Sequence, residues 1–423
     1  MIQVTASSTA PLRDIRLASE TRPLADAGDL VRALDLSEGG FSWLRDGVGF
    51  IANGVTARIA VGAGHDRFTS ASHGVAALLA NAAEDNQVNL PGTGLIAVGA
   101  LPFGLLPGEL IIPRVVIGRD RDGTCWITRT AVDRLPTDQP ASIAPVTENE
   151  PSEFRIEAHP DRDAWEAAVD RALDEIAHGR VSKVVLARQV LVQADRPIPI
   201  HALLDRLRHG HPSCFTFAYD QFVGASPELL VRRTGNEVVS GPTAGTISRG
   251  ATIEDDDALA SALTNSAKDS AEHRIVVDAV VEALTPWCTS INAAQYPEVV
   301  RLATVSHLTT TVRGTLREPS PSALELVGAM HPTPAVGGMP RSAALELIAE
   351  LEPFDRELYA GPVGWVDAHG DGEWAVALRC AHIDGNRARL FTGAGIVAGS
   401  DPSAEWAETQ SKLEPMLQAI LRP

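Results

Sequence analysis

FTGAGIVAGSDPSAEWAETQSKLEPM, residues 391–416, predicts a strand, a glycine-rich turn and a helix in succession. The helix is expected to begin near Ser400-Asp401-Pro402, because Ser or Asp caps a first turn and Pro is tolerated within it. Glu405 and Glu408 lie three residues apart, and Lys412 follows Glu408 by four. At this spacing all three side chains project from one face of the helix.

Carboxylates on neighbouring helical turns repel each other unless a cation lies between them. Oxygen ligands without His or Cys suit a hard ion such as Mg²⁺. For one helix alone, a solvated face with a Glu–Lys pair is the commoner explanation. However, NSAKDSAEHRIVVDAVVEAL, residues 265–284, repeats the pattern with Asp269 and Glu272. Two such helices facing each other would form one oxygen-rich metal site.

The composition is typical of a soluble globular protein. Of the 423 residues, 44% are hydrophobic and 21% are charged, which is ordinary for a packed domain. A net charge of −18 without a basic stripe argues against nucleic acid as a partner. The four cysteines are scattered, with no CxxC spacing, and predict reduced, mostly buried thiols in a cytoplasmic protein.

Neither the N-terminus nor the longest uncharged run predicts export or a membrane span. Residues 1–14 lack the basic and apolar regions of a signal peptide. Residues 90–108 are interrupted by three prolines and several glycines, so they predict buried strands and turns rather than a transmembrane helix. We therefore expect a cytoplasmic protein that does not bind a membrane.

The chain is expected to divide at RLPTDQPASIAPVTENEP, residues 134–151, whose four prolines predict a loop or linker. Before it, the sequence predicts short strands, turns and one helix, with hairpin signals at Asp46-Gly47 and Asn53-Gly54. No titratable groups gather there at catalytic spacing. We therefore assign residues 1–150 a structural role, as the variable N-terminal part of the fold, and residues 151–423 to the catalytic region.

Two candidate acid–base groups lie at the ends of predicted strands. Lys183 begins a strand over residues 182–192. A lysine there usually reaches solvent, but if it points inward, desolvation favours its neutral form and makes it a usable general base. Glu228 lies between Pro227 and an apolar strand, where a carboxylate costs free energy unless it is partnered or protonated. Alternatively, Glu228 caps backbone amides in a loop.

Three weaker signals concern anion binding. Arg379 is expected inside a strand over residues 373–383, where its guanidinium needs an anion such as a carboxylate. The small loop SGPTAGT, residues 240–246, could cradle an anionic substrate. His307 lies between two predicted short strands and, taken alone, fits a hydrogen-bonding core residue better than a catalyst.

Eight motifs, in this order, resemble the chorismate-utilising enzymes, and within that family the isochorismate synthases most closely. They are SKVVLAR, GASPELL, GPTAGT, SAKDSAEH, HPTPAVGG, ELEPFDRELYAGPVGW, VALRCA and FTGAGIVAGSDPSAEWAETQSKL. Together they cover about residues 160–420. The first 150 residues resemble the family only loosely.

The resemblance implies an α+β fold like that of anthranilate synthase component I, with two large, orthogonally packed antiparallel β-sheets flanked by helices. It also implies a deep cleft with chorismate as substrate and Mg²⁺ as cofactor. Glu272 and Glu408 match direct metal ligands of the family, while Asp269 and Glu405 match acidic neighbours that can act through water.

Further positions match groups that bind and convert the substrate. Tyr359 and Arg379 match residues that hold the enolpyruvyl carboxylate. The other residues expected at the substrate are Gly245, Thr246, His307, Ala335, Gly393 and Lys412. Lys183 is expected to remove a proton from a water that attacks ring carbon 2, and Glu228 to protonate the hydroxyl leaving carbon 4. The implied reaction is the reversible, Mg²⁺-dependent isomerisation of chorismate to isochorismate.

Related activities stay open at this point. In anthranilate and aminodeoxychorismate synthases a glutaminase partner delivers ammonia, but that branch resembles a pattern with Gln at the position of Lys183. Salicylate synthases share nearly every residue and then release pyruvate, but resemble a pattern with Thr in place of Ala335. Ala335 could also simply pack in a tight loop. A non-enzymatic scaffold is disfavoured because every candidate acid–base and acidic residue is present.

We therefore expect a monomeric isomerase without a glutaminase subunit. Its product would serve menaquinone or siderophore biosynthesis, and the sequence does not distinguish the two.

Overall fold

The computed structural model describes residues 2–5, 16–135 and 150–421, so most of the predicted linker lies outside the described residues. The helices are α1 (Arg67–Leu79), α2 (Arg162–Ala177), α3 (Ile200–Gly210), α4 (Ile253–Asn265), α5 (Ala267–Leu284), α6 (Ala323–Met330), α7 (Arg341–Leu351) and α8 (Pro402–Leu421), with one 3₁₀ turn at Thr285–Trp287. In the described ranges, no helix is long and apolar enough to cross a membrane.

A first set of antiparallel strands contains the strand that begins at Lys183. In order of pairing it comprises β9 (Phe154–His159), β10 (Lys183–Ala194), β24 (Arg387–Val397), β23 (Cys380–Asp384), β12 (Phe222–Ser226), β11 (Phe215–Tyr219), β3 (Phe41–Arg45), β4 (Val48–Val61) and β7 (Gly108–Arg119). Beyond β7 follow the antiparallel strands β8 (Cys125–Val132) and β2 (Leu17–Leu24). Two edge strands pair in parallel, β5 (Ala83–Asn86) with β2 and β1 (Ile2–Thr5) with β4. This set supplies the long β10–β24 pair that supports the predicted catalytic lysine.

A second set of strands also starts from β7. It comprises β6 (Ile96–Ala100), β21 (Pro362–Asp367), β22 (Gly372–Val376), β13 (Leu229–Thr234), β14 (Glu237–Ser240), β19 (Val312–Leu316) and β16 (Cys288–Ala293). Strand β7 pairs with β4 and β8 of the first set and with β6 of the second. Hydrogen bonds therefore link 21 described strands, including the short β20 (Gly338–Met339), into one system. The predicted α+β class with large antiparallel sheets is confirmed, with the two sheets joined through β7.

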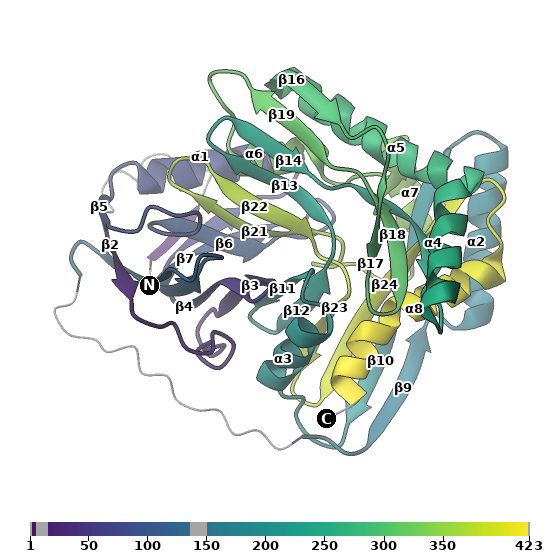
Figure 1. The fold of residues 1–423 in the computed structure, drawn as a ribbon, viewed down its shortest axis with the longest axis horizontal. Coiled ribbons are helices and arrows are strands. Elements are labelled where there is room, and N and C mark those ends of the chain that lie inside the picture. Colours follow the sequence, from purple (N-terminus) through teal and green to yellow (C-terminus); the bar gives the residue numbers. More distant parts are fainter. Residues whose placement is uncertain (1, 6–15, 136–149, 422–423) are drawn as a thin grey trace.

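A small third sheet lies beside the second set (Figure 1). It contains β15 (Thr243–Ser248), β18 (Val305–Thr309) and β17 (Glu298–Arg301). Helices α4 and α5 pack on β15. The prediction that SGPTAGT, residues 240–246, is a loop is wrong, because only Gly241 and Pro242 lie between β14 and β15. The arrangement brings this stretch and His307 next to the start of α5.

The chain crosses between the two large strand sets at two adjacent connections. Pro227-Glu228 joins β12 of the first set to β13 of the second, and residues 377–379 return the chain from β22 to β23. The two connections are bound to each other, since the Val376 amide donates to the Glu228 carbonyl (3.1 Å) and the Ala225 amide donates to the Arg379 carbonyl (3.2 Å). The predicted acid and the predicted anion-binding residue are therefore held side by side by backbone hydrogen bonds.

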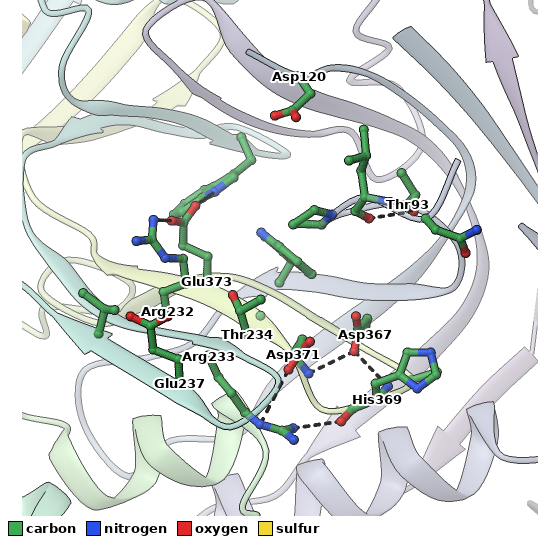
Figure 2. Close-up of a pocket in the computed structure, with 18 of the residues that line it drawn as sticks. Thr93, Asp120, Arg232, Arg233, Thr234, Glu237, Asp367, His369, Asp371 and Glu373 are labelled. Atoms are coloured by element: carbon green, nitrogen blue, oxygen red, sulfur yellow. Dashed lines mark hydrogen bonds and ion pairs between the residues drawn. The ribbon is translucent and has the colours of Figure 1, made fainter. Parts of the chain in front are cut away.

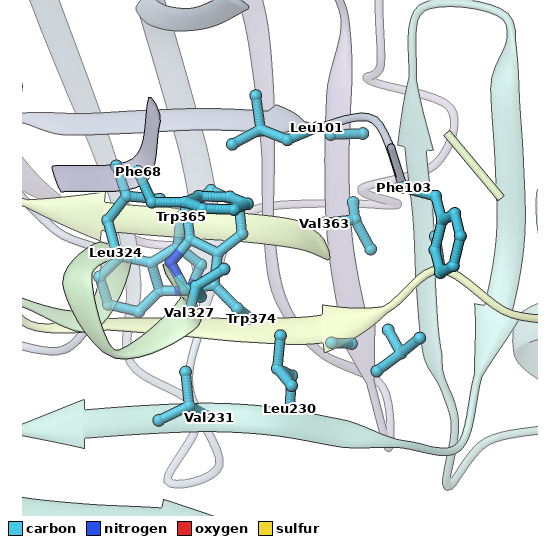
Figure 3. Packing of buried hydrophobic residues seen from close by; sticks show 14 of the residues in the cluster. Phe68, Leu101, Phe103, Leu230, Val231, Leu324, Val327, Val363, Trp365 and Trp374 are labelled. Carbon is cyan, nitrogen blue, oxygen red and sulfur yellow. The ribbon is translucent and has the colours of Figure 1, made fainter. Parts of the chain in front are cut away.

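The hydrophobic core extends across both halves of the sequence. Figure 3 shows Leu324 and Val327 of α6 packed near Trp374 of β22, together with Phe68 of α1 and Trp365 of β21. The N-terminal part also contributes β3, which pairs with β11, and β6, which pairs with β21. Residues 16–135 thus complete the same sheets and core as the catalytic region. All four cysteines are buried and free, as the sequence predicts.

Of the two predicted hairpin turns, one is confirmed and the other is wrong. Asp46-Gly47 forms the expected β3–β4 hairpin, with positive φ at both residues, but Asn53-Gly54 does not turn the chain. Gly54, with φ 66°, lies within the continuous strand β4, just before an irregularity in its pairing with β7 between Val55 and Ala57. A glycine with positive φ can serve a bulge as well as a turn.

Candidate active site

A cavity lies where the chain crosses between the two strand sets. Its lining includes every predicted substrate-binding residue: Gly245, Thr246, His307, Ala335, Tyr359, Arg379, Gly393 and Lys412. It also includes Glu228, Glu272 and Glu408. These residues come from nine separate stretches of the chain, so their convergence is a product of the fold.

Lys183 points inward and is fully buried. Its Nζ lies 2.9 Å from Oε1 of Glu272 on α5. Gly395, on the neighbouring strand β24, leaves room for this pair, because a Cβ there would lie 3.0 Å from Lys183 Cε and 2.7 Å from Glu272 Oε1. The solvent-reaching alternative for Lys183 is therefore wrong. The lysine lies directly behind the cavity lining, next to Glu272.

Glu228 is buried in the crossing between β12 and β13. Burial raises the pKa of its carboxyl to about 8, although the positive charges of Lys183 and Lys412 oppose the shift. At neutral pH this carboxyl therefore holds a proton. That state fits a proton donor and disfavours the alternative of an ionised group capping amides.

Arg379 occupies the second crossing, with φ 48°. The prediction that it lies inside one strand is wrong, since the segment splits into β22 and β23 around it. Non-glycine residues rarely adopt this conformation, and such backbone strain is concentrated at functional sites. The turn directs the guanidinium into the cavity instead of onto a sheet face.

A hydrogen-bonded chain holds this guanidinium in place. Arg379 Nη2 donates to His307 Nε2 at 2.6 Å, and His307 Nδ1 lies 3.1 Å from Thr246 Oγ1. Burial, reinforced by the charges of Arg379 and Lys412, lowers the pKa of His307 well below its usual value. The imidazole is therefore neutral and accepts from Arg379. Nη1 of Arg379 is buried and, within the described residues, has no hydrogen-bond partner, so it is available to an anion.

Tyr359 and Gly393 lie next to each other in the cavity wall. Tyr359 is buried and stacks on Phe391, with ring centroids 5.3 Å apart and an interplanar angle of 9°. A Cβ at position 393 would lie 3.0 Å from Tyr359 Oη and 2.8 Å from the Leu186 carbonyl oxygen. Lys412 Nζ donates to the Gly393 carbonyl at 3.2 Å. Only glycine permits this close approach.

The predicted metal ligands lie at the starts of α5 and α8. Asp401 caps α8 as expected, since its Oδ1 accepts from the Ala404 amide (2.9 Å). Ser266, which the sequence analysis did not identify as a cap, caps α5, since its Oγ accepts from the Asp269 amide (3.2 Å). Arg188 of β10 holds α8 in place through two contacts. Its Nε donates to Thr409 Oγ1 at 2.8 Å, and its guanidinium stacks on the Trp406 ring, 4.0 Å from the ring centroid. The helices therefore present the acidic residues at defined positions.

The carboxylates fit a hard cation by their donor chemistry, but they are not arranged as a preformed cage. Glu272 and Glu408 line the cavity, each paired with a lysine: Glu272 with Lys183, and Glu408 with Lys412 at 2.7 Å. Burial and the neighbouring charge of Glu408 raise the pKa of Glu405, which is the like-charge repulsion that a cation would relieve. Asp269 and Glu405 are not in the cavity lining. Over the described ranges, no three acidic, His or Cys side chains are grouped closely enough to bind a metal.

Several lining residues escaped the sequence analysis. They are Val185, Pro227, Thr243, Ala244, Val336, Leu378, Phe391, Thr392 and Gly395. Thr243 and Gly395 carried a signal, since they belong to the GPTAGT and FTGAG stretches that were singled out as wholes. The apolar walls formed by Leu378 and Phe391 carried none, because an apolar residue beside a cavity looks like any core residue in sequence.

A second cavity lies elsewhere in the fold and contains none of the predicted site residues (Figure 2). Two of its arginines are engaged with their neighbours: Arg232 pairs with Glu373 (3.3 Å), and Arg233 Nη1 donates to the His369 carbonyl (2.8 Å). The first cavity, where the predicted site residues meet, is therefore the candidate active site.

Comparisons with known proteins agree on one family. Residues 37–421 match the sequence profile described as "Chorismate binding enzyme". The isochorismate synthase DhbC of Bacillus subtilis (strain 168) is 38% identical over 337 residues, which are 77% of this chain and 80% of that protein.

Two solved structures are similar over almost the whole chain. A candidate 2,3-dihydroxybenzoate-specific isochorismate synthase, DhbC from Bacillus anthracis, matches with a TM-score of 0.79 and 34% identity, covering 94% of this chain and 100% of that one. The menaquinone-specific isochorismate synthase MenF from Escherichia coli matches with a TM-score of 0.80 and 28% identity, covering 97% and 95%.

Proposed function

Because the chain belongs to the chorismate-binding enzyme family, we propose that it is an isochorismate synthase that converts chorismate reversibly into isochorismate. Relatives of that name match most of its length. The single observation that carries the proposal is the buried, protonated Glu228 at one cavity with the buried Lys183. A proton donor and a lysine base in one enclosed site are what the exchange of two hydroxyl positions requires.

Chorismate carries two carboxylates, so an acidic protein must supply local positive charge. In this proposal Arg379 Nη1 and Tyr359 bind the enolpyruvyl carboxylate. The free Nη1 supports this, because a guanidinium fork can bind one carboxylate while its other arm stays on His307. Lys412, with the backbone at Gly245, Thr246 and Gly393, would hold the ring and its carboxylate.

The reaction is a displacement with a shift of the ring double bonds. Water attacks ring carbon 2 and gives its proton to Lys183, which must first be in its neutral form. The bond between carbon 4 and its hydroxyl breaks as Glu228 donates its proton, and the hydroxyl leaves as water. One water enters and one leaves, so substrate and product are isomers.

Mg²⁺ is part of the proposal as the cofactor, with Glu272 and Glu408 as ligands and Asp269 and Glu405 as acidic neighbours that act through water. When bound, it would withdraw electron density from the ring carboxylate and fix the ring's orientation. The like-charge repulsion between Glu405 and Glu408 supports a cation at this position.

The proposal also includes a monomeric, cytoplasmic protein that acts without a glutaminase subunit. Its product would enter either a menaquinone or a siderophore route.

The test is product analysis of the purified protein with chorismate and Mg²⁺. Chromatography is expected to show isochorismate rising to equilibrium with chorismate, with little pyruvate in the same tube. Stoichiometric pyruvate with salicylate would instead indicate a salicylate synthase. Turnover that requires added ammonia would indicate the anthranilate or aminodeoxychorismate branch. The absence of any turnover would remove the enzymatic assignment.

A further inference from the structure

Glu352 and Arg356 form an ion pair directly behind the cavity wall. Glu352 ends α7, and Arg356 lies four residues later in the loop that leads to Tyr359. Their side chains are 4% and 3% exposed, and Arg356 Nε donates to Glu352 Oε2 at 2.9 Å. Burying two charges is costly unless further hydrogen bonds satisfy them. The partners of those further hydrogen bonds therefore show which segments the ion pair connects.

The remaining hydrogen bonds of the pair go to two walls of the cavity. Arg356 Nη1 donates to the carbonyl of Val336 (2.7 Å), in the loop that carries Ala335. Arg356 Nη2 donates to the carbonyl of Val185 (2.7 Å), on β10. Val185 and Val336 both line the cavity. One planar guanidinium thus spans the gap between the loop and the strand.

Glu352 and the backbone extend this connection. Glu352 Oε1 accepts from the Ala187 amide of β10 at 2.7 Å, and the Arg356 carbonyl accepts from the Tyr359 amide at 2.9 Å. Lys183, four residues before Ala187, begins the same strand. The two residues of the ion pair are therefore hydrogen-bonded to β10, which begins with the proposed base Lys183, and to the loop that carries Ala335. They are also bonded to Tyr359, which is proposed to bind a carboxylate of the substrate.

The far side of the guanidinium is closed by a residue of the N-terminal part. Arg356 Cζ lies 4.4 Å above the ring of Phe103, whose edge packs against His331 with centroids 5.8 Å apart. The Phe103 amide also donates to the Glu357 carbonyl at 2.8 Å. A residue from a region assigned only a structural role thus supports the wall of the site.

We infer that the Glu352–Arg356 pair is a positioning element that sets the spacing between the Ala335–Val336 loop and strand β10, and that Phe103 holds it in place. Neither residue of the pair lines the cavity; both act through the backbone they bind. The inference rests on the proposed function only in its test, which assays the proposed reaction; the contacts of the pair do not depend on that function.

The variants are chosen to separate position from charge and volume. Arg356→Lys keeps the charge but cannot donate to both carbonyls and the carboxylate in one plane. Glu352→Gln keeps the shape and an acceptor for Ala187 but removes the charge that holds Arg356. Because the charged groups proposed to bind the substrate, Arg379 and Lys412, lie on other segments, we expect kcat to fall about 10-fold or more while KM changes less than about 3-fold, since small misplacements of reacting groups are costly.

Arg206→Lys is the matched control. Arg206 on α3 also pairs with a glutamate, Glu150, and donates to a backbone carbonyl, that of Ala419 (2.8 Å), near the C-terminal end of α8. Neither Arg206 nor Ala419 lines the cavity. Its kcat and KM are expected to stay at wild-type values even if its melting temperature falls. Loss of kcat in the Glu352 and Arg356 variants that is no larger than in this control, or a KM change equal to the kcat change, would overturn the inference.

A gentler variant covers the case in which the ion-pair variants do not fold. Phe103→Leu leaves every hydrogen bond of the pair in place and removes only the ring beneath the guanidinium. We expect kcat to fall about 3-fold at unchanged KM, and an unchanged kcat contradicts the inference. If the wild type forms salicylate or anthranilate instead of isochorismate, the proposed function fails, while kcat for the product actually formed still tests the positioning role.

Discussion

Nη2 of Arg379 lies 2.6 Å from Nε2 of His307, which fixes one arm of a buried guanidinium on a neutral imidazole. The other arm, Nη1, is buried without a partner among the described residues. A buried, unpaired guanidinium arm is costly. The position of this unpaired arm at a cavity is explained if a carboxylate of the substrate accepts its hydrogen bond.

The first prediction follows from this free arm. Arg379→Lys keeps the positive charge but loses the fork that binds His307 and a carboxylate together. Charge-assisted hydrogen bonds contribute about 1.5–3 kcal/mol, so we expect the KM for chorismate to rise roughly 10- to 100-fold. Steady-state kinetics measure this change. Arg232→Lys, in the second cavity, serves as control and should leave KM unchanged; equal effects of the two substitutions would refute the assignment.

The second prediction concerns proton transfer. Lys183→Ala and Glu228→Gln should each still bind chorismate but lose isochorismate formation by ~10²-fold or more, as expected for general acid–base groups. Calorimetric titration measures binding, and chromatography measures the product. Full activity of Lys183→Ala would mean that another group activates the water.

The third prediction is a pH dependence set by Glu228. Its carboxyl must be protonated to donate, and burial raises its pKa from 4.5 to about 8, so the wild-type rate should fall as pH rises through about 8. The residual activity of Glu228→Gln should lack that decline. A wild-type profile that stays flat well above pH 8 would exclude Glu228 as the acid.

The same group also predicts a pH dependence of stability. The native carboxyl keeps a proton that the unfolded chain loses above about pH 4.5, so folding takes up a proton between pH 4.5 and 8. The free energy of unfolding therefore falls as pH rises through that window. Glu228→Gln has no such proton to lose. Denaturant titrations at pH 5 and pH 8 should show a smaller decline for the variant than for the wild type.

The fourth prediction concerns the metal. If Glu272 and Glu408 bind Mg²⁺, replacing either with Gln should remove most activity and weaken Mg²⁺ binding while the fold stays intact. Titration of Mg²⁺ into each variant, with circular dichroism as the folding check, measures this. Glu414→Gln, two turns further along α8 and outside the cavity lining, is the matched control. Near-normal Mg²⁺ dependence in either site variant would disprove the ligand assignment.

The fifth prediction concerns Ala335, which lines the cavity in the loop held by Arg356. Alanine offers no hydrogen bond that could turn bound isochorismate towards loss of its enolpyruvyl group. Wild-type protein should therefore release little pyruvate, and Ala335→Thr should release more per isochorismate formed. A coupled pyruvate assay measures the ratio. An unchanged ratio would mean that Ala335 only packs in the loop.

The sequence alone determined the local elements that carry the acidic residues. Asp401 caps α8 as predicted, because a cap depends only on side chains within one turn of the helix. The i, i+3 spacing then fixes which residues share a face. The order of motifs also indicated the family, and with it the residues that line the cavity.

Only the tertiary structure decided how those residues meet. The direction of Lys183 depends on its position between β20 and β24 and on the space left by Gly395, which lies more than 200 residues away in the chain. Arg379 enters the cavity because the chain passes from one set of strands to the other at this point. The apolar residues around it give no sign that the strand ends there. The Glu352–Arg356 pair acquires its role from carbonyls at positions 185 and 336. Burial, the pKa of Glu228 and backbone hydrogen bonds between distant segments all arise from long-range packing, which local patterns in a single sequence do not encode.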